Sequence, residues 1–374
     1  MGQQEKQLSA NDRAIKTALH LTGGGRLGAK NSTKKSVDDN QVFDPAAAVD
    51  RVAARGAITR ANKLLDLASD AVAETVRAAR KKEPVDLDTL KLVVAELIAN
   101  FDRCPNALLW ALATNRRMRY FSRRSVGSAV LALTLGRFLG FKPRALHDLV
   151  LGALLLDIGK ITVPVTILAK AGELTEAEQI FVRRHVDEGL RILGTMHGLS
   201  ADTVEMVRSH HERVDGSGYP AGLRGTEISL YAQIAGIVDS FDALSLSRYY
   251  SDGVNGHDAL GELNDERGQK FDAELVDKFI CAIGVFPTGT WIEFDNGCMG
   301  VVCLQNPRDP MYPHVALISD SNQQPFLAVR WLTLSKQSIA RAMQPAERPR
   351  YFDSMEQSLQ STVYGTWPRK TLAV

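Results

Sequence analysis

Apolar side chains recur at helical spacing along most of the chain, and this pattern limits the folds it can adopt. The pattern begins in the Ala-rich stretch 45–80 and continues in a second helical stretch that Asp86 or Asp88 can cap. Further segments lie at 130–138, 146–156, 176–193, 200–211, 230–245 and 273–283. Nothing here alternates with the period of two expected of a half-buried strand. The sequence therefore predicts a mainly α protein built as a helical bundle.

The character of the chain changes after Pro287. Residues 291–294 and 299–304 flank an Asp-Asn-Gly turn, which is typical of a hairpin, and 314–318 and 326–329 are two more candidate strands. We therefore expect a small β-rich appendage at the C-terminal end. The predicted organisation is a flexible leader at 1–45, a helical N-terminal region at 46–104, a main helical domain at 105–285, a β subdomain at 286–345 and a tail at 346–374.

Composition excludes several classes of protein. The chain is 45% hydrophobic and 24% charged with a formal net charge of +2, which is ordinary for a globular protein and gives no clear sign of nucleic-acid binding. A local basic run favours a solvated helix face over a nucleic-acid patch; it consists of Arg116, Arg117, Arg119, Arg123 and Arg124. No apolar run reaches the roughly 18 residues of a membrane span, and no signal peptide is evident, so we expect a cytoplasmic protein.

The cysteines point the same way. Their spacing matches no zinc motif, so we interpret them as reduced thiols of a protein core; they are Cys104, Cys281, Cys298 and Cys303.

The helical body contains seven residues that can bind a metal or a phosphate: Asp157, Lys160, His185, His210, His211, Asp239 and Asp242. Carboxylates and imidazoles on separate helices, each beside an apolar run, can converge in a bundle core as metal ligands. On one regular helix His210 and His211 would point about 100° apart, so they suit two ions, or one ion and a phosphate. Asp239 and Asp242 share a helix face, so one can bind the metal ion while the other orients that ligand.

The order and spacing of these residues resemble the HD-GYP family. The resemblance covers about residues 105–285 and rests on Asp157-Ile158-Gly159-Lys160 with Pro164, His185 with Gly189, His210 through Pro220, and the stretch 237–244. That family is a branch of the HD phosphohydrolases, metal-dependent enzymes that linearise and hydrolyse the bacterial second messenger cyclic di-GMP. The resemblance implies an HD-type helical bundle and a cyclic di-GMP or related nucleotide as ligand.

The resemblance also implies roles for single residues. Its metal ligands would be Asp157, which bridges two ions, and His185, His210, His211 and Asp239. Lys160 would lie near the scissile phosphate and act with Asp157 in catalysis, and Arg248 would contact a ligand phosphate. The loop with Gly218, Tyr219 and Pro220 would shape the pocket and contact a signalling protein partner.

Two positions depart from the family pattern. Leu156 replaces the histidine of the His-Asp pair, and Arg124 replaces an upstream histidine. In the wider superfamily these two histidines serve the same metal, so a full bi- or trinuclear site is not expected. Arg124 keeps its charge at all ordinary pH values, and we hypothesise that it replaces the charge of the lost ion by pairing with Asp157 and Asp239. One Fe, Mn or Zn ion could still bind Asp157, His185 and His210.

Three functions remain open at this point. The favoured one is a catalytically degenerate HD-GYP protein that acts as a nucleotide receptor or protein-interaction module, because the Gly-Tyr-Pro loop is intact while two ligand positions are lost. The second is a working cyclic di-GMP phosphodiesterase with an atypical metal site. The third is a scaffold that binds no nucleotide, in which the motif residues only hold turns and hydrogen-bond one another.

Overall fold

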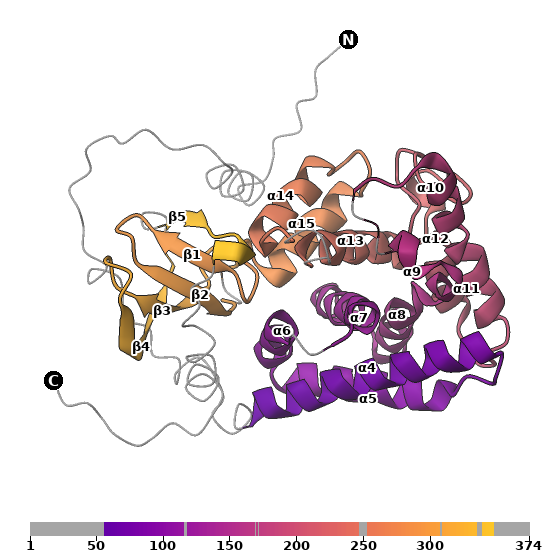
Figure 1. Cartoon of the computed structure of the whole chain (residues 1–374), viewed down its shortest axis with the longest axis horizontal. Helices are drawn as coiled ribbons and strands as arrows, with labels where there is room; N and C mark the ends of the chain where they lie inside the picture. The colour runs from indigo at the N-terminus through magenta and orange to yellow at the C-terminus, as the bar shows by residue number, and fades with distance from the viewer. Residues whose placement is uncertain are drawn as a thin grey trace, which may run out of the picture.

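The computed structural model describes residues 56–115, 118–168, 170, 172–246, 253–306, 309–334 and 339–347. Within that part, helices extend to Ile283 and a small sheet follows them (Figure 1). The predicted fold class, mainly α with a C-terminal β appendage, is therefore confirmed. The leader at 1–45 and nearly all of the tail lie outside the described residues, and the domain boundaries stay predictions.

Helix α7 (Tyr120–Phe138) is the central helix of the bundle. Fourteen of its residues are buried, as expected for a helix with neighbours on all sides. It packs against α4 (Ala57–Lys81), α8 (Pro143–Leu155), α13 (Leu230–Ser245) and α15 (Ala273–Ile283).

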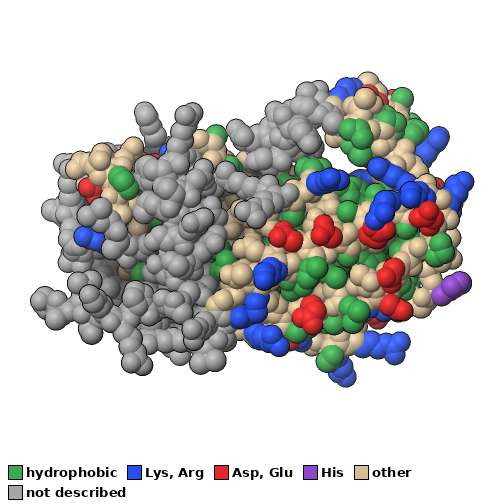
Figure 2. Space-filling view, turned by 60° about the horizontal axis from the view of Figure 1, so that its bottom comes forward, with side chains coloured by type: hydrophobic (Ala, Val, Ile, Leu, Met, Phe, Trp, Pro, Cys, Tyr) green, Lys and Arg blue, Asp and Glu red, His purple; other side chains and the backbone are tan. Residues whose placement is uncertain are grey.

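The N-terminal helices form one side of this bundle. Helix α4 runs beside α5 (Leu87–Arg103), and α6 (Pro105–Thr114) packs on both (Figure 1). Of the two predicted caps of α5, Asp86 is the one used, because its side chain accepts a hydrogen bond from the Thr89 backbone N–H. On the face in Figure 2, Lys and Arg side chains are interspersed with Asp and Glu. Among the described residues of this face, no patch of a single sign would suit a nucleic acid.

The remaining helices of the bundle lie between α8 and α15 along the chain. They are η2 (Ile158–Thr162), α9 (Val165–Leu168), α10 (Glu176–Arg183), α11 (His185–Leu193), α12 (Ala201–Ser209), η3 (Gly225–Glu227) and α14 (Gly256–Asp265). The segment 176–193, predicted as one helix, is two helices that meet at Arg184. Helix α14 was not predicted, because its short sequence has two glycines and a weak apolar pattern; its buried face includes Leu260 and Leu263.

The appendage is a five-stranded antiparallel sheet with the strand order β4-β3-β2-β1-β5. Its strands are β1 (Trp291–Phe294), β2 (Met299–Leu304), β3 (His314–Ser319), β4 (Pro325–Thr333) and β5 (Ile339–Ala342). The first four match predicted strands. The fifth was missed because Ile-Ala-Arg-Ala is short and contains one β-branched residue.

The sheet is attached to the bundle at α6 and α14. The Gln305 backbone N–H donates to Asn106 Oδ1 (3.0 Å), and Gln344 Nε2 donates to Asp258 Oδ2 (2.6 Å). Three of the four cysteines are buried and Cys281 is half-buried, and no disulfide joins these four described residues. Among the described helices, none is both long and apolar enough to cross a membrane.

Removal of a core side chain from α5 should destabilise the bundle. Leu97 is fully buried, so Leu97→Ala is expected to lower the free energy of unfolding by about 2–5 kcal/mol. Leu92 lies on the same helix with 68% of its surface exposed, so Leu92→Ala should change the free energy of unfolding by less than about 0.5 kcal/mol. Urea unfolding followed by circular dichroism measures both values. Equal losses in the two variants would contradict the burial of this face.

Candidate metal centre

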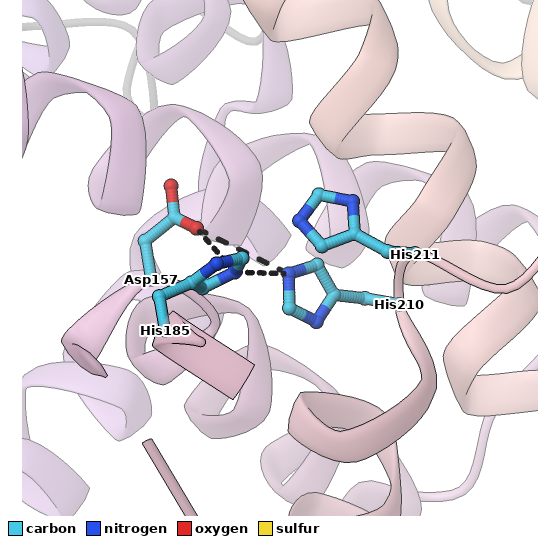
Figure 3. Close-up of side chains that lie close together, drawn as sticks. All are labelled: Asp157, His185, His210 and His211. Atoms are coloured by element: carbon cyan, nitrogen blue, oxygen red, sulfur yellow. Dashed lines mark hydrogen bonds and ion pairs between the residues drawn. The ribbon is translucent and has the colours of Figure 1, made fainter. Parts of the chain in front are cut away.

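Four side chains converge where three helices begin or end (Figure 3). Asp157 follows the end of α8, His185 is the first residue of α11, and His210 and His211 follow the end of α12. One ligand atom from each lies within 4.8 Å of all the others. The structure thus brings together four of the five predicted metal ligands.

His210 and His211 correct the sequence-based geometry. We expected their rings to diverge on a regular helix, but α12 ends at Ser209 and both residues lie beyond it. Their ring centroids are only 4.0 Å apart, and both rings face the cluster. The pair can therefore serve a single ion, which the assumption of a continuous helix had excluded.

Hydrogen bonds fix which nitrogen of two rings is free. His185 Nδ1 lies 2.8 Å from the Val182 carbonyl and His210 Nδ1 lies 2.8 Å from the Val207 carbonyl. A carbonyl oxygen only accepts, so both Nδ1 atoms carry the proton, and each neutral ring presents the lone pair of Nε2. These two Nε2 atoms face each other at 3.5 Å.

Two further atoms of the cluster lack a hydrogen-bond partner. Buried Asp157 Oδ1 has no hydrogen-bond partner, although it lies 3.7 Å from His185 Nε2 and 4.0 Å from His210 Nε2. His211 Nε2 is buried without a partner as well. Buried lone pairs of this kind are unfavourable unless a proton or a metal ion joins them. The donor set of one carboxylate and three imidazoles fits a divalent metal ion.

Burial keeps the three imidazoles neutral. It lowers the pKa of His185 to about 4, lowers that of His210, and, with the neighbouring His210, sets that of His211 well below its ordinary value. Burial alone would raise the pKa of Asp157, but the charge of Lys160, whose Nζ lies 2.7 Å from Asp157 Oδ2, helps to hold it below the ordinary range. Neutral imidazoles beside an ionised carboxylate are the forms that bind a metal.

A close backbone approach positions Asp157 and His185. A Cβ at Gly159 would overlap the carbonyl oxygen of His185 and the amide nitrogen of Gly189. Only glycine lets η2 lie this close to α11.

A second charged group lies on α7 and α13. Arg124 Nη2 donates to Asp239 Oδ1 (2.5 Å) and Arg124 Nη1 to Asp242 Oδ2 (3.0 Å), while Arg123 Nη1 donates to Asp242 Oδ1 (3.0 Å). We call these four residues the arginine–aspartate network. Burial alone would lower the pKa of Arg124, but Asp239 and Asp242 hold it above the ordinary value. A Cβ at Gly127 would overlap the Arg123–Asp242 pair, so glycine makes room for it.

The network bears on two earlier predictions. Arg123 and Arg124 of the basic run form buried or half-buried ion pairs. The prediction of a solvated helix face is therefore wrong for these two residues. The ion pair of Arg124 with Asp239 is confirmed, whereas with Asp157 the structure gives no direct ion pair, although the charge of Arg124 acts on its pKa. The role of Asp239 as a metal ligand stays a prediction. The sequence offered no signal for Arg123, whose partner Asp242 is distant along the chain.

The Gly-Tyr-Pro loop is held from within. The buried Glu212 carboxylate accepts hydrogen bonds from the Ala221 N–H (2.7 Å) and the Leu223 N–H (3.0 Å). A Cβ at Gly218 would overlap the backbone of residues 211–213, and the Tyr219–Pro220 peptide bond is cis. The Tyr219 ring stacks on His211 with centroids 4.6 Å apart. The sequence had not singled out Glu212 as the residue that fastens this loop.

Leu156 and Arg248 are the two other positions that the sequence analysis singled out. Leu156 is 2% exposed within the hydrophobic core and offers no ligand atom. Arg248, the predicted phosphate contact, lies outside the described residues.

Comparison with known proteins places these features in a family. Residues 107–275 match the family model described as "HD domain". The chain therefore contains an HD domain. It is 36% identical to a cyclic di-GMP phosphodiesterase from Pseudomonas aeruginosa, over 71% of this chain and 64% of that protein. It is 32% identical to a 3′3′-cGAMP-specific phosphodiesterase from Vibrio cholerae, over 46% of this chain and 40% of that protein.

A structural comparison supports the fold of this HD domain protein. A solved structure of an HDG"Y"P protein from Bdellovibrio bacteriovorus superposes with a TM-score of 0.51 at 17% identity, and covers 71% of this chain and 76% of that chain. The chain spans less than two thirds of the length of the two phosphodiesterases above. HD domains bind divalent metals, and the four-residue cluster is the corresponding candidate in this chain.

The close approach at Gly159 can be tested. Gly159→Ala is expected to lower the free energy of unfolding by about 1–3 kcal/mol and to weaken Mn²⁺ or Zn²⁺ binding, because η2 must move away from α11. Gly261→Ala on α14 is the matched control, since its Cβ meets nothing within 4 Å; it should stabilise by about 0.5–1 kcal/mol. Urea unfolding and metal titration measure the two effects. Wild-type metal affinity in Gly159→Ala would contradict this account.

Proposed function

We propose that this HD domain protein is a cyclic di-GMP receptor or protein-interaction module in bacterial signalling, with hydrolysis weak or absent. The nucleotide class is taken from the relatives, which are phosphodiesterases for cyclic di-GMP or cGAMP. The observation that carries the proposed loss of hydrolysis is the arginine–aspartate network. Arg124 engages Asp239 and Asp242 from a position where the family has a metal-binding histidine.

The network makes a second metal ion unfavourable. A cation beside Asp239 would have to displace a guanidinium at 2.5 Å that cannot lose its proton. Leu156 supplies no lone pair in compensation. Phosphodiester cleavage by two metals needs one ion for the attacking oxygen and one for the leaving oxygen. A protein limited to the four-residue cluster lacks that second charge.

One metal ion would bind Asp157, His185, His210 and His211. When bound, a divalent ion supplies a Lewis acid and a site for a phosphate oxygen. Lys160 places an ammonium group beside Asp157 and can neutralise a second phosphate oxygen. Tyr219 shields the ring of His211 from the side of the Gly-Tyr-Pro loop. These contacts favour recognition of a phosphodiester without requiring its cleavage.

A working phosphodiesterase with an atypical metal site is the second candidate. The observation in its favour is the complete set of three imidazoles and one carboxylate, together with Lys160. A single metal can generate hydroxide at neutral pH. A scaffold without nucleotide binding is the third candidate, but hydrogen bonds among motif residues do not explain the buried Asp157 Oδ1 and His211 Nε2, which have no partner.

Metal content and turnover separate these functions. We expect the purified protein to bind one divalent ion and cyclic di-GMP, and to release no linear dinucleotide or GMP on chromatography. His210→Ala should abolish the metal, whereas His197→Ala, a change at an exposed histidine, should keep it. Metal-dependent turnover that His210→Ala removes would establish the phosphodiesterase instead. Failure to bind the nucleotide at micromolar concentration, with or without metal, would favour the scaffold.

Restoring the two lost histidines should restore metal capacity. The double variant Arg124→His, Leu156→His removes the guanidinium and adds two imidazoles beside Asp157 and Asp239, so metal content per chain should rise. Arg137→His is the matched control, because it breaks only a surface ion pair with Asp102. Atomic absorption on both purified variants measures the metal. Unchanged occupancy in the double variant would show that these positions do not belong to a lost metal site.

A further inference from the structure

Three side chains form layers from the metal centre outward. The half-buried His211 ring stacks on Tyr219, with centroids 4.6 Å apart and ring planes 23° apart. The Arg183 guanidinium carbon lies 4.8 Å from the centroid of the Tyr219 ring. Arg183 is exposed, whereas His211 belongs to the cluster. The guanidinium of Arg183 therefore lies at the outer edge of the centre, and the Tyr219 ring lies between it and His211.

The charge of Arg183 has no counter-charge in the described part of the chain. Arg183 makes no ion pair and no hydrogen bond there. Arg191 differs, because it pairs with Glu188, and both of these residues lie on the next helix, α11. The face of the tyrosine ring attracts the guanidinium, but it accepts no hydrogen bond from the N–H groups at the edge of the guanidinium. A guanidinium held in this way presents a fork of donors that matches the oxygens of a phosphodiester.

The helix that bears Arg183 is fixed at both ends. Helix α10 begins with a capping box in which Thr175 and Glu178 exchange hydrogen bonds, and Lys170 pairs with Glu178 at 2.5 Å. It ends at Arg183, and Arg184 alone separates it from His185, the first residue of α11. Arg183 therefore lies two residues before His185 of the cluster, at the end of a capped helix.

Two cations thus stand at different depths. Lys160 lies within the centre, 2.7 Å from Asp157, and Arg183 lies one aromatic layer further out. A ligand with one phosphate can satisfy only one of them, whereas a cyclic dinucleotide has two phosphodiester groups separated by its sugars. Resting on the proposed function, we propose that Arg183 binds the second phosphodiester of a cyclic dinucleotide whose first phosphodiester faces Lys160.

The test compares two neighbouring arginines. Arg183→Gln is expected to raise the Kd for cyclic di-GMP about tenfold, the usual loss for a charge-assisted hydrogen bond. Arg184→Gln removes a charge that is also exposed and whose guanidinium lies 5.9 Å from the Phe181 ring, so its Kd should stay near the wild-type value. Calorimetric titration of the full chain measures both, and thermal unfolding confirms that each variant is folded. Arg183→Lys keeps the charge without the fork and should give an intermediate Kd.

Each alternative outcome has a distinct meaning. A wild-type protein that binds no cyclic di-GMP removes the proposed function and this inference with it. A wild-type protein that binds it while Arg183→Gln binds equally well overturns the role of Arg183 alone. Equal weakening by Arg183→Gln and Arg184→Gln would indicate a diffuse charge effect and would also overturn it. Cyclic GMP has one phosphodiester, so a wild-type protein that binds it as tightly as the dinucleotide would contradict a two-phosphate site.

Discussion

The pairing of Arg124 with Asp239 and Asp242 links the central helix to the wall of the metal centre. The arginine is on α7 and both acids are on α13, so the contact joins two helices that also pack through apolar side chains. Its side chains are 1–11% exposed, and removing one partner of such a buried pair typically costs about 3–5 kcal/mol. The fold therefore depends on a cation at this position, and here that cation is part of the covalent chain.

The centre is consequently divided into two unequal halves. On the side of α7 and α13, protein charges balance one another through the arginine–aspartate network. On the side of α8, α11 and α12, lone pairs of Asp157, His185 and His210 face one another without a donor. The first half is complete without any ligand, whereas the second is not. This asymmetry distinguishes loss of the whole metal site from loss of one half of it.

Local patterns predicted much of the fold and part of the centre. Helix α13 spans the predicted 230–245 because its apolar period is regular and Ser229 caps it. The convergence of His210 and His211 could not be predicted, because it depends on α12 ending at Ser209, and the sequence has no glycine or proline there to end it. Arg123 could not be recognised as a buried partner either, because its environment is set by Asp242 and by the space at Gly127, both of which need the packed structure.

The four-residue cluster has a consequence for the stability of the chain as well as for its ligands. Its members come from three separate points along the sequence, at the end of α8, the start of α11 and the end of α12. A cation held by all of them would act as a cross-link that closes two loops, in the way a disulfide restricts the unfolded chain. Retention of the histidines then has a reason that does not involve chemistry on a nucleotide. The availability of metal would set how firmly this corner of the bundle is folded.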